Sequence, residues 1–233
     1  MPKRLSFRSL RTRHGGAPDL RRSLRATVAA DGDVPRPSFA KRQPLLRPVL
    51  ILIDISGSMK AHTADYLKAA HTAVQTLERV EAFTLGTRLT RITTALKPAR
   101  LDQALARVAE AVDDWDGGTR IGPTLLALLA VPRFLTFARG AVTLLLSDGL
   151  ETGPPDDFVK AMRRLSALSH RLSLLTPLAA DPRFAPRTEA LQAVLPHLDD
   201  LADGSSLARL TDFITGLKHN APAAHHIWNR MAS

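Results

Sequence analysis

After residue 48, the apolar positions follow two alternating patterns. Short continuous apolar runs, such as Val49–Ile53 and Ala141–Leu146, are typical of strands that are buried on both faces. Between these runs, apolar residues recur every three or four positions, which predicts amphipathic helices. Parallel strands need a crossover connection, and helices serve as crossovers. The pattern therefore predicts a doubly wound α/β domain, with a mostly parallel sheet and helices on both faces.

The remaining elements follow the same alternation. Further strands are expected at Ala82–Leu85 and Leu172–Leu175, and the segment RLTRIT after Gly86 is expected to return beside Ala82–Leu85 as one short antiparallel edge strand. A Leu-rich helix is expected to open at Gly122 and Pro123, since proline is tolerated in the first turn of a helix. Four further helical faces are marked by Leu67, Ala70, Val74 and Leu77; Leu101, Leu105, Val108 and Val112; Phe158, Met162, Leu165 and Leu168; and Leu207, Leu210, Ile214 and Leu217.

The first 48 residues differ from the rest in composition. They hold twelve Lys and Arg against three Asp, so most of the formal net charge of +10 lies there. Four prolines between Pro35 and Pro48 and few large apolar residues predict a flexible, basic arm that buries little surface. We therefore divide the chain into a basic arm (1–48), the α/β domain (49–217) and a C-terminal tail (218–233).

The charge of this arm leaves several interpretations open. A solvated tail without a partner and an arm that binds an anionic surface of another protein both fit the composition. Nucleic acid is not favoured, because the whole chain has one Tyr and two Trp and so lacks interleaved aromatic residues. The first sixteen residues, which are rich in Arg and Ser and free of acids, also match the composition of a transit peptide.

The composition also bears on the compartment. The longest apolar runs are far shorter than the roughly 20 residues that a membrane span requires, and no N-terminal signal pattern is visible. The chain has no cysteine, which excludes disulfides and thiolate metal sites and fits a reducing compartment. We expect a cytoplasmic protein without a membrane span.

Oxygen-bearing side chains follow two of the predicted strands. Asp54, Ser56 and Ser58 alternate directly after the first strand, Asp148 follows the 141–146 strand, and Thr119 lies in the Gly-rich segment GGTRIG. In doubly wound sheets, ligands gather where the carboxyl ends of the strands converge. Two carboxylates and three hydroxyls are hard oxygen donors that suit Mg²⁺, Mn²⁺ or Ca²⁺ rather than zinc or copper. The sequence therefore predicts a divalent-cation site, with Mg²⁺ as the first choice.

Charge counting indicates what such a site would do. Two carboxylates only balance the charge of a divalent cation, and neutral hydroxyls are weak donors. The metal would therefore stay electrophilic, and an open coordination position would attract a carboxylate from another molecule.

The D-x-S-x-S sequence at 54–58, together with Thr119 and Asp148, resembles the metal-ion-dependent adhesion site (MIDAS) of von Willebrand factor type A (VWA) domains. The segments FTLGTRLTRIT, VDDWDGGTRIG and ARGAVTLLLSDGLETG further resemble the CoxE-like branch of VWA proteins. This resemblance implies a non-catalytic cytoplasmic assembly factor, or maturation chaperone, that works with a MoxR-type AAA+ ATPase. It also implies a client protein that supplies an acidic residue to the metal, in the best-known case during maturation of the copper and molybdenum centre of carbon monoxide dehydrogenase.

Two alternatives stay open beside this interpretation. One is a VWA adaptor that serves a different client complex. The other is a Mg²⁺-dependent phosphatase of the haloacid dehalogenase class, whose nucleophilic Asp also follows a strand; here Ser56 stands where that class has its second acid, which removes the general acid/base. Glu151, three residues after Asp148, is expected to open the helix that follows this loop.

Overall fold

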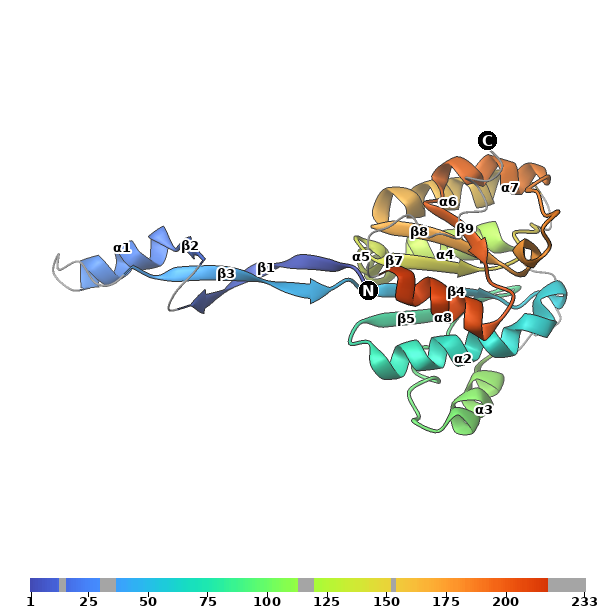
Figure 1. Cartoon of the computed structure of the whole chain (residues 1–233), viewed down its shortest axis with the longest axis horizontal. Coiled ribbons are helices and arrows are strands. Elements are labelled where there is room, and N and C mark those ends of the chain that lie inside the picture. Colours follow the sequence, from blue (N-terminus) through green and yellow to red (C-terminus); the bar gives the residue numbers. More distant parts are fainter. Residues whose placement is uncertain (13–15, 30–36, 113–119, 152–153, 218–233) are drawn as a thin grey trace. The chain divides into compact units, whose positions relative to one another are not determined.

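The computed structural model describes the chain apart from residues 13–15, 30–36, 113–119, 152–153 and 218–233. The chain divides into two compact units (Figure 1). The smaller unit is Pro2–Leu46, and the larger comprises Arg47–Ser233 together with Met1. The domain limits predicted from the sequence stay a prediction, and the predicted tail lies outside the described residues.

The larger unit is built on a six-stranded sheet with the strand order β6-β5-β4-β7-β8-β9 (Figure 1). The edge strand β6 is antiparallel to β5, and every other neighbouring pair is parallel. The strands are β4 (Val49–Asp54), β5 (Val80–Leu85), β6 (Leu89–Arg91), β7 (Val142–Leu146), β8 (Arg171–Thr176) and β9 (Asp200–Asp203). The predicted fold class, including the single short antiparallel edge strand, is confirmed.

Strand β4 lies at the centre of this sheet and is buried along its whole length. Ile51 and Ile53 join the core on one face, and Leu50 and Leu52 join the core on the other. This arrangement explains the continuous apolar run of β4, because a strand covered on both faces gains from apolar side chains at every position. The chain leaves β4 toward β5 on one side and later returns to β7 on the other, so the switch point of the sheet lies between β4 and β7.

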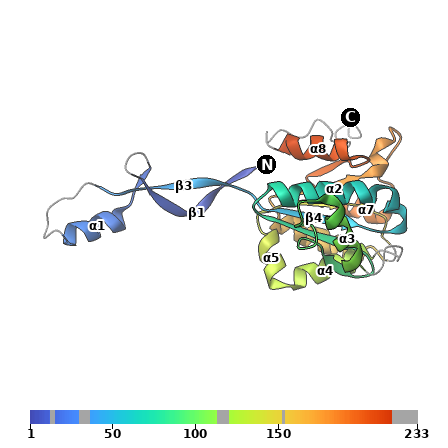
Figure 2. The same cartoon turned by 90° about the horizontal axis from the view of Figure 1, so that it is seen from below.

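Helices cover both faces of the sheet (Figures 1 and 2). One core lies under α2 (Lys60–Thr76), α3 (Leu101–Ala111) and α8 (Leu207–Gly216). The other lies under α4 (Ile121–Ala130), α5 (Pro132–Ala138), α6 (Asp156–Leu168) and α7 (Glu189–Val194). Short 3₁₀ turns are η1 (Gly57–Met59), η2 (Pro177–Ala180) and η3 (Leu195–His197). Within the described residues, no single helix has the length and apolar character to cross a membrane. Helices α4 and α5 reach that length and apolar character only when taken together, and they are bent by 101° relative to one another.

A buried ion pair joins β8 to the edge strand β9. The guanidinium of Arg171 donates to both carboxylate oxygens of Asp200, with Nε to Oδ2 and Nη2 to Oδ1 distances of 2.6 Å each. The Ser173 hydroxyl donates to the same Oδ2 at 2.6 Å. The hydrogen bond to Asp200 is the main cause that raises the pKa of Arg171. Two donors thus satisfy a carboxylate that would otherwise be costly to bury.

Near the opposite edge of the sheet, Glu81 of β5 accepts hydrogen bonds from Arg91 of the edge strand β6 and from Thr93. Burial raises its pKa, but these hydrogen bonds and the charges of Arg91 and Arg133 outweigh burial, so that the pKa is lowered. A carboxylate with a lowered pKa contributes stability above its unfolded-state pKa, and this contribution is lost as the pH falls through the lower folded-state value.

We therefore expect the wild type to lose unfolding free energy more steeply than Glu81→Gln once the pH falls below about 4.5. Urea unfolding of both proteins between neutral pH and the acid limit measures this difference. If the unfolding free energies of the two proteins fall in parallel with pH, Glu81 does not cause the loss of stability at low pH.

The smaller unit differs from the flexible lead-in expected from its composition. Strand β1 (Lys3–Thr12) pairs antiparallel with β3 (Phe39–Leu46), and the two-residue strand β2 (Ala17–Pro18) pairs with the other edge of β3. Its helix α1 (Leu20–Ala29) has no buried residue. A ladder of backbone hydrogen bonds does not require buried side chains, which is why apolar content alone did not reveal these strands.

Candidate metal centre

The predicted site lies at the carboxyl ends of the neighbouring strands β4 and β7. Ile53 pairs with Leu146, so Asp54 and Ser147 are the next residues on two adjacent strands. The Ser147 hydroxyl donates to Oδ2 of Asp54 at 2.6 Å and accepts from the backbone amide of Gly149 at 2.9 Å. Gly149 adopts φ +74°, which glycine reaches without strain, and turns the chain directly after Asp148. Ser147 therefore holds the two strand ends together.

The loop after β4 brings the two serines to the second carboxylate. The Ser56 amide donates to Oδ1 of Asp54 at 2.9 Å, and the Ser56 and Ser58 hydroxyl oxygens lie 3.0 Å apart. The Ser58 hydroxyl donates to Oδ2 of Asp148 at 2.5 Å. Directly after Ser58, the buried side chain of Met59 anchors the turn that leads into α2. Four of the five predicted residues thus form one connected cluster.

The fifth predicted residue, Thr119, lies outside the described residues. The described chain resumes at Arg120, and α4 begins at Ile121. The assignment of all five residues as metal ligands stays a prediction.

The two carboxylates of the cluster lie deep, and the hydroxyls lie at its mouth. Asp54 is 0% exposed and Asp148 is 3% exposed, whereas Ser58 is exposed and Ser56 is half-buried. Burial is the main cause that raises the pKa of Asp54. Hydrogen bonds from Ser147 and Ser56 lower this pKa in part, and the charge of Asp148 raises it further. After burial, the charges of Asp148 and Asp54 also raise the pKa of the Tyr66 phenol in α2.

The donor set fits a hard divalent cation. In the part of the chain that the structure describes, neither carboxylate forms an ion pair with a lysine or arginine. Two buried like charges without a basic partner destabilise one another, and a bound cation relieves this repulsion. The same described residues contain no cluster of three His, Asp or Glu that could hold a metal. A cation here would therefore need the serine hydroxyls as well as the carboxylates, which suits Mg²⁺ better than zinc.

Two residues near the site were not assigned a role there from the sequence. Ser147 connects the two strand ends. Its position directly before Asp148 was the feature of the sequence that could have indicated a role at the site. Glu151 was expected to open α6, and this expectation is wrong: α6 begins at Asp156, and Oε2 of Glu151 accepts from the backbone amide of Gly122 in α4 at 2.8 Å. The physical reason is that Asp156 and Asp157 already place carboxylates in the first turn of α6.

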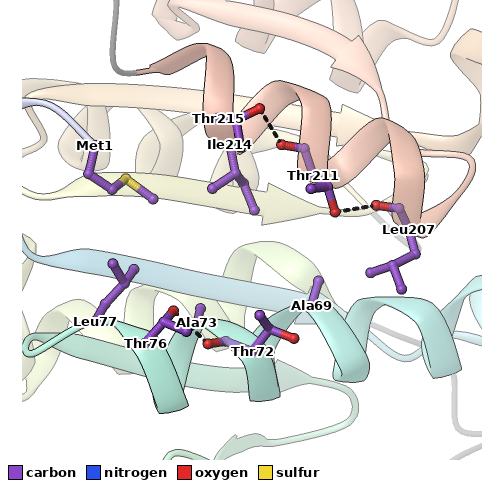
Figure 3. A pocket seen from close by; sticks show the side chains of 10 residues that line it. All are labelled: Met1, Ala69, Thr72, Ala73, Thr76, Leu77, Leu207, Thr211, Ile214 and Thr215. Atoms are coloured by element: carbon purple, nitrogen blue, oxygen red, sulfur yellow. Dashed lines mark hydrogen bonds between the residues drawn. The ribbon is translucent and has the colours of Figure 1, made fainter.

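A groove between α2 and α8 is chemically different from this site (Figure 3). Its volume is about 290 Å³. Thr72, Thr76, Thr211 and Thr215 line it, and each donates its hydroxyl to the carbonyl four residues earlier in its own helix. The groove therefore presents mainly methyl and methylene groups, and its lining has no carboxylate for a cation.

Comparisons with known proteins address the identity of the chain. A family model described as "VWA domain containing CoxE-like protein" matches residues 1–210. No curated protein matches the chain. Among solved structures, "von Willebrand factor type A from Catenulispora acidiphila" aligns with 18% identity and a TM-score of 0.51, covering 76% of this chain and 43% of that chain.

Two other solved structures align with lower TM-scores. Proximal thread matrix protein 1 from the mussel byssus, with a zinc occupied MIDAS motif, has 13% identity, a TM-score of 0.48, and coverage of 74% of this chain and 48% of that chain. Manganese-loaded TRAP protein of Plasmodium vivax has 16% identity, a TM-score of 0.40, and coverage of 65% and 73%. This chain thus spans less than half of the Catenulispora and mussel proteins.

The family match includes the region of the arm as well as most of the α/β unit. The Catenulispora structure agrees with the observed sheet and helices at the level of the fold. The resemblance inferred from the sequence motifs is therefore confirmed, and the chain belongs to the family of VWA domain containing CoxE-like proteins.

Proposed function

We propose that this chain is a non-catalytic, metal-dependent protein-binding adaptor. In this role it acts as an assembly factor with a MoxR-type AAA+ ATPase in the maturation of a metalloenzyme such as carbon monoxide dehydrogenase. The observation that carries the proposal is the cluster of two buried carboxylates at the switch point of the sheet, with two serine hydroxyls at its mouth. The family match is consistent with an adaptor.

The chain's own residues have separate tasks at this site. Asp54 and Asp148 would balance the charge of Mg²⁺, and Ser56 and Ser58 would add neutral oxygen donors, with Thr119 as the predicted fifth ligand. Ser147 fixes the orientation of the Asp54 carboxylate through its 2.6 Å hydrogen bond. When bound, the cation supplies an electrophilic centre that attracts an acidic side chain of a client protein.

The residues around the cluster favour binding over catalysis. Ser58 donates to the Asp148 carboxylate rather than to an imidazole, so the pairing that activates a serine nucleophile with histidine is not formed there. The sequence around the serines also lacks the G-x-S-x-G elbow of α/β hydrolases. Ser56 cannot replace the second acid of a haloacid dehalogenase-type phosphatase.

The first expected result is that Mg²⁺ or Mn²⁺ raises the melting temperature of the full chain. A ligand that binds only the folded state at one hundred times its dissociation constant stabilises that state by about 2.7 kcal/mol. For a chain of this size, this corresponds to roughly 5–10 °C. Asp148→Ala should remove most of the increment, whereas Asp156→Ala, which changes an exposed acid in the first turn of α6, should retain it. Differential scanning calorimetry with and without metal measures the increments.

Identical melting curves with and without saturating metal would contradict the metal site. The same three proteins test the adaptor role. A MoxR-type ATPase purified from the same organism should bind wild type and Asp156→Ala with Mg²⁺ present, and binding should weaken with a chelator or with Asp148→Ala. Hydrolysis of an aryl phosphate that disappears in Asp54→Ala would instead identify a phosphatase.

A further inference from the structure

Glu151 makes a long-range contact between the loop of the predicted ligand Asp148 and the start of α4. It lies three residues after Asp148, and its Oε2 accepts from the backbone amide of Gly122 at 2.8 Å. Gly122 lies in the first turn of α4. Three residues span at most about 10 Å. Glu151 therefore links the start of α4 to a segment that lies close to the Asp148 carboxylate.

Among the described residues, the start of α4 receives this contact in place of a cap from the residue before it. The residue before it, Arg120, makes no side-chain capping hydrogen bond, and its first turn contains no acid. The first amide groups of a helix have no partner within the helix and favour a negative charge nearby. The Glu151 carboxylate supplies both an acceptor and a charge, from 29 residues further along the chain.

The first turn of α4 also has little room to move toward α6. A Cβ atom at Gly122 would lie 2.4 Å from the backbone nitrogen of Phe158. The start of α4 is therefore held by backbone packing on one side and by the Glu151 carboxylate on another.

The loop that carries Glu151 is equally constrained on the side of Asp148. The Leu150 amide donates to Oδ1 of Asp148 at 3.0 Å, and the Gly149 amide donates to Ser147 at 2.9 Å. These bonds tie the backbone next to Glu151 to the side chains of Ser147 and Asp148.

We propose that Glu151 is a positioning residue for the metal site, which joins the loop of Asp148 to the start of α4 and thereby sets the affinity for the cation. This inference rests on the proposed function. Residues that orient metal ligands typically change metal affinity by about 10- to 100-fold when they are replaced. A purely structural cap would change the unfolding free energy and leave the affinity of the folded protein unaltered.

Two substitutions of Glu151 separate the effect of its side-chain length from the effect of its charge. Glu151→Gln removes the charge but keeps an oxygen that can accept from Gly122, so we expect Mn²⁺ affinity close to wild type. Glu151→Asp keeps the charge but is one methylene shorter, so we expect affinity lower by about 10-fold or more. The Mn²⁺ affinity of each variant is measured by titrating the full chain with Mn²⁺. The electron paramagnetic resonance signal gives the concentration of free Mn²⁺, and Asp156→Ala serves as the control. Melting without metal establishes that each variant is folded.

Each outcome decides between the two proposals. Wild type that binds no Mn²⁺ would overturn the proposed function and this inference with it. Tight binding by wild type and equally tight binding by Glu151→Asp would overturn only the inference. Weak binding by Glu151→Gln with normal binding by Glu151→Asp would show that charge, not the hydrogen bond to α4, is what the site requires, and this also overturns the inference.

Discussion

Replacing Asp200 by alanine is expected to lower the free energy of unfolding by about 3–5 kcal/mol. The Asp200 side chain is fully buried, and the side chain of its partner Arg171 is only 14% exposed. The substitution removes both 2.6 Å contacts of the guanidinium and the acceptor of the Ser173 hydroxyl. Losing one member of a buried ion pair removes the main partner of the other charge, which costs more than the pair itself contributes. The charge of Asp199 also acts on Arg171 and remains in this variant.

Guanidinium chloride unfolding of wild type and Asp200→Ala measures this loss. The matched control is Asp102→Ala, because Arg100 also makes two hydrogen bonds to Asp102, but the two side chains are 71% and 64% exposed. Exposed pairs contribute little, and an acid in the first turn of a helix, as Asp102 is in α3, adds only a small favourable interaction with the helix dipole, so the control should lose much less stability than Asp200→Ala. If Asp200→Ala unfolds at the same denaturant concentration as this control, the buried pair does not anchor β9.

Gly122→Ala is expected to destabilise the protein by about 1–3 kcal/mol, although alanine normally favours a helix over glycine. The new Cβ atom would lie 2.4 Å from the nitrogen of Phe158 and 2.7 Å from the carbonyl carbon of Asp157. Both atoms belong to backbone, so no side-chain rotation relieves the overlap. Helix α4 must instead move away from α6.

Thermal and urea unfolding test whether Gly122→Ala lowers the stability, and a second helical glycine serves as the control. Gly216 is the last residue of α8, and a Cβ atom there would meet nothing within 4 Å. Gly216→Ala should therefore leave the stability unchanged or raise it by up to about 1 kcal/mol. Equal stability changes for the two glycines would mean that α4 and α6 are not in close backbone contact.

Much of the larger unit could be predicted from local patterns. The central strands β4 and β7 are continuous apolar runs because both of their faces are covered. The turn at Gly86 and Thr87 indicated the antiparallel edge strand. Asp54, Ser56, Ser58 and Asp148 could be grouped because they follow strands whose carboxyl ends meet at the switch point.

Other features depend on contacts between distant residues and left no local signal. Strand β9 carries the buried Asp200, whose hydrogen bonds from Arg171 and Ser173 offset the cost of burying a carboxylate in a strand. The role of Glu151 depends on Gly122, and that of Ser147 on Asp54, which is 93 residues away in the sequence. The strands of the smaller unit were missed because its few large apolar residues gave no sign of a buried core, and backbone pairing does not require one.

The central position of β4 has a consequence for the order of events during synthesis. The strand β7 and the Ser147 hydroxyl that contacts Asp54 are translated after β4, with Ser147 93 residues beyond Asp54. A nascent chain therefore carries the first carboxylate and both serines well before the second carboxylate exists. A cation that needs both carboxylates, as we propose, would therefore bind only after the sheet is complete through β7.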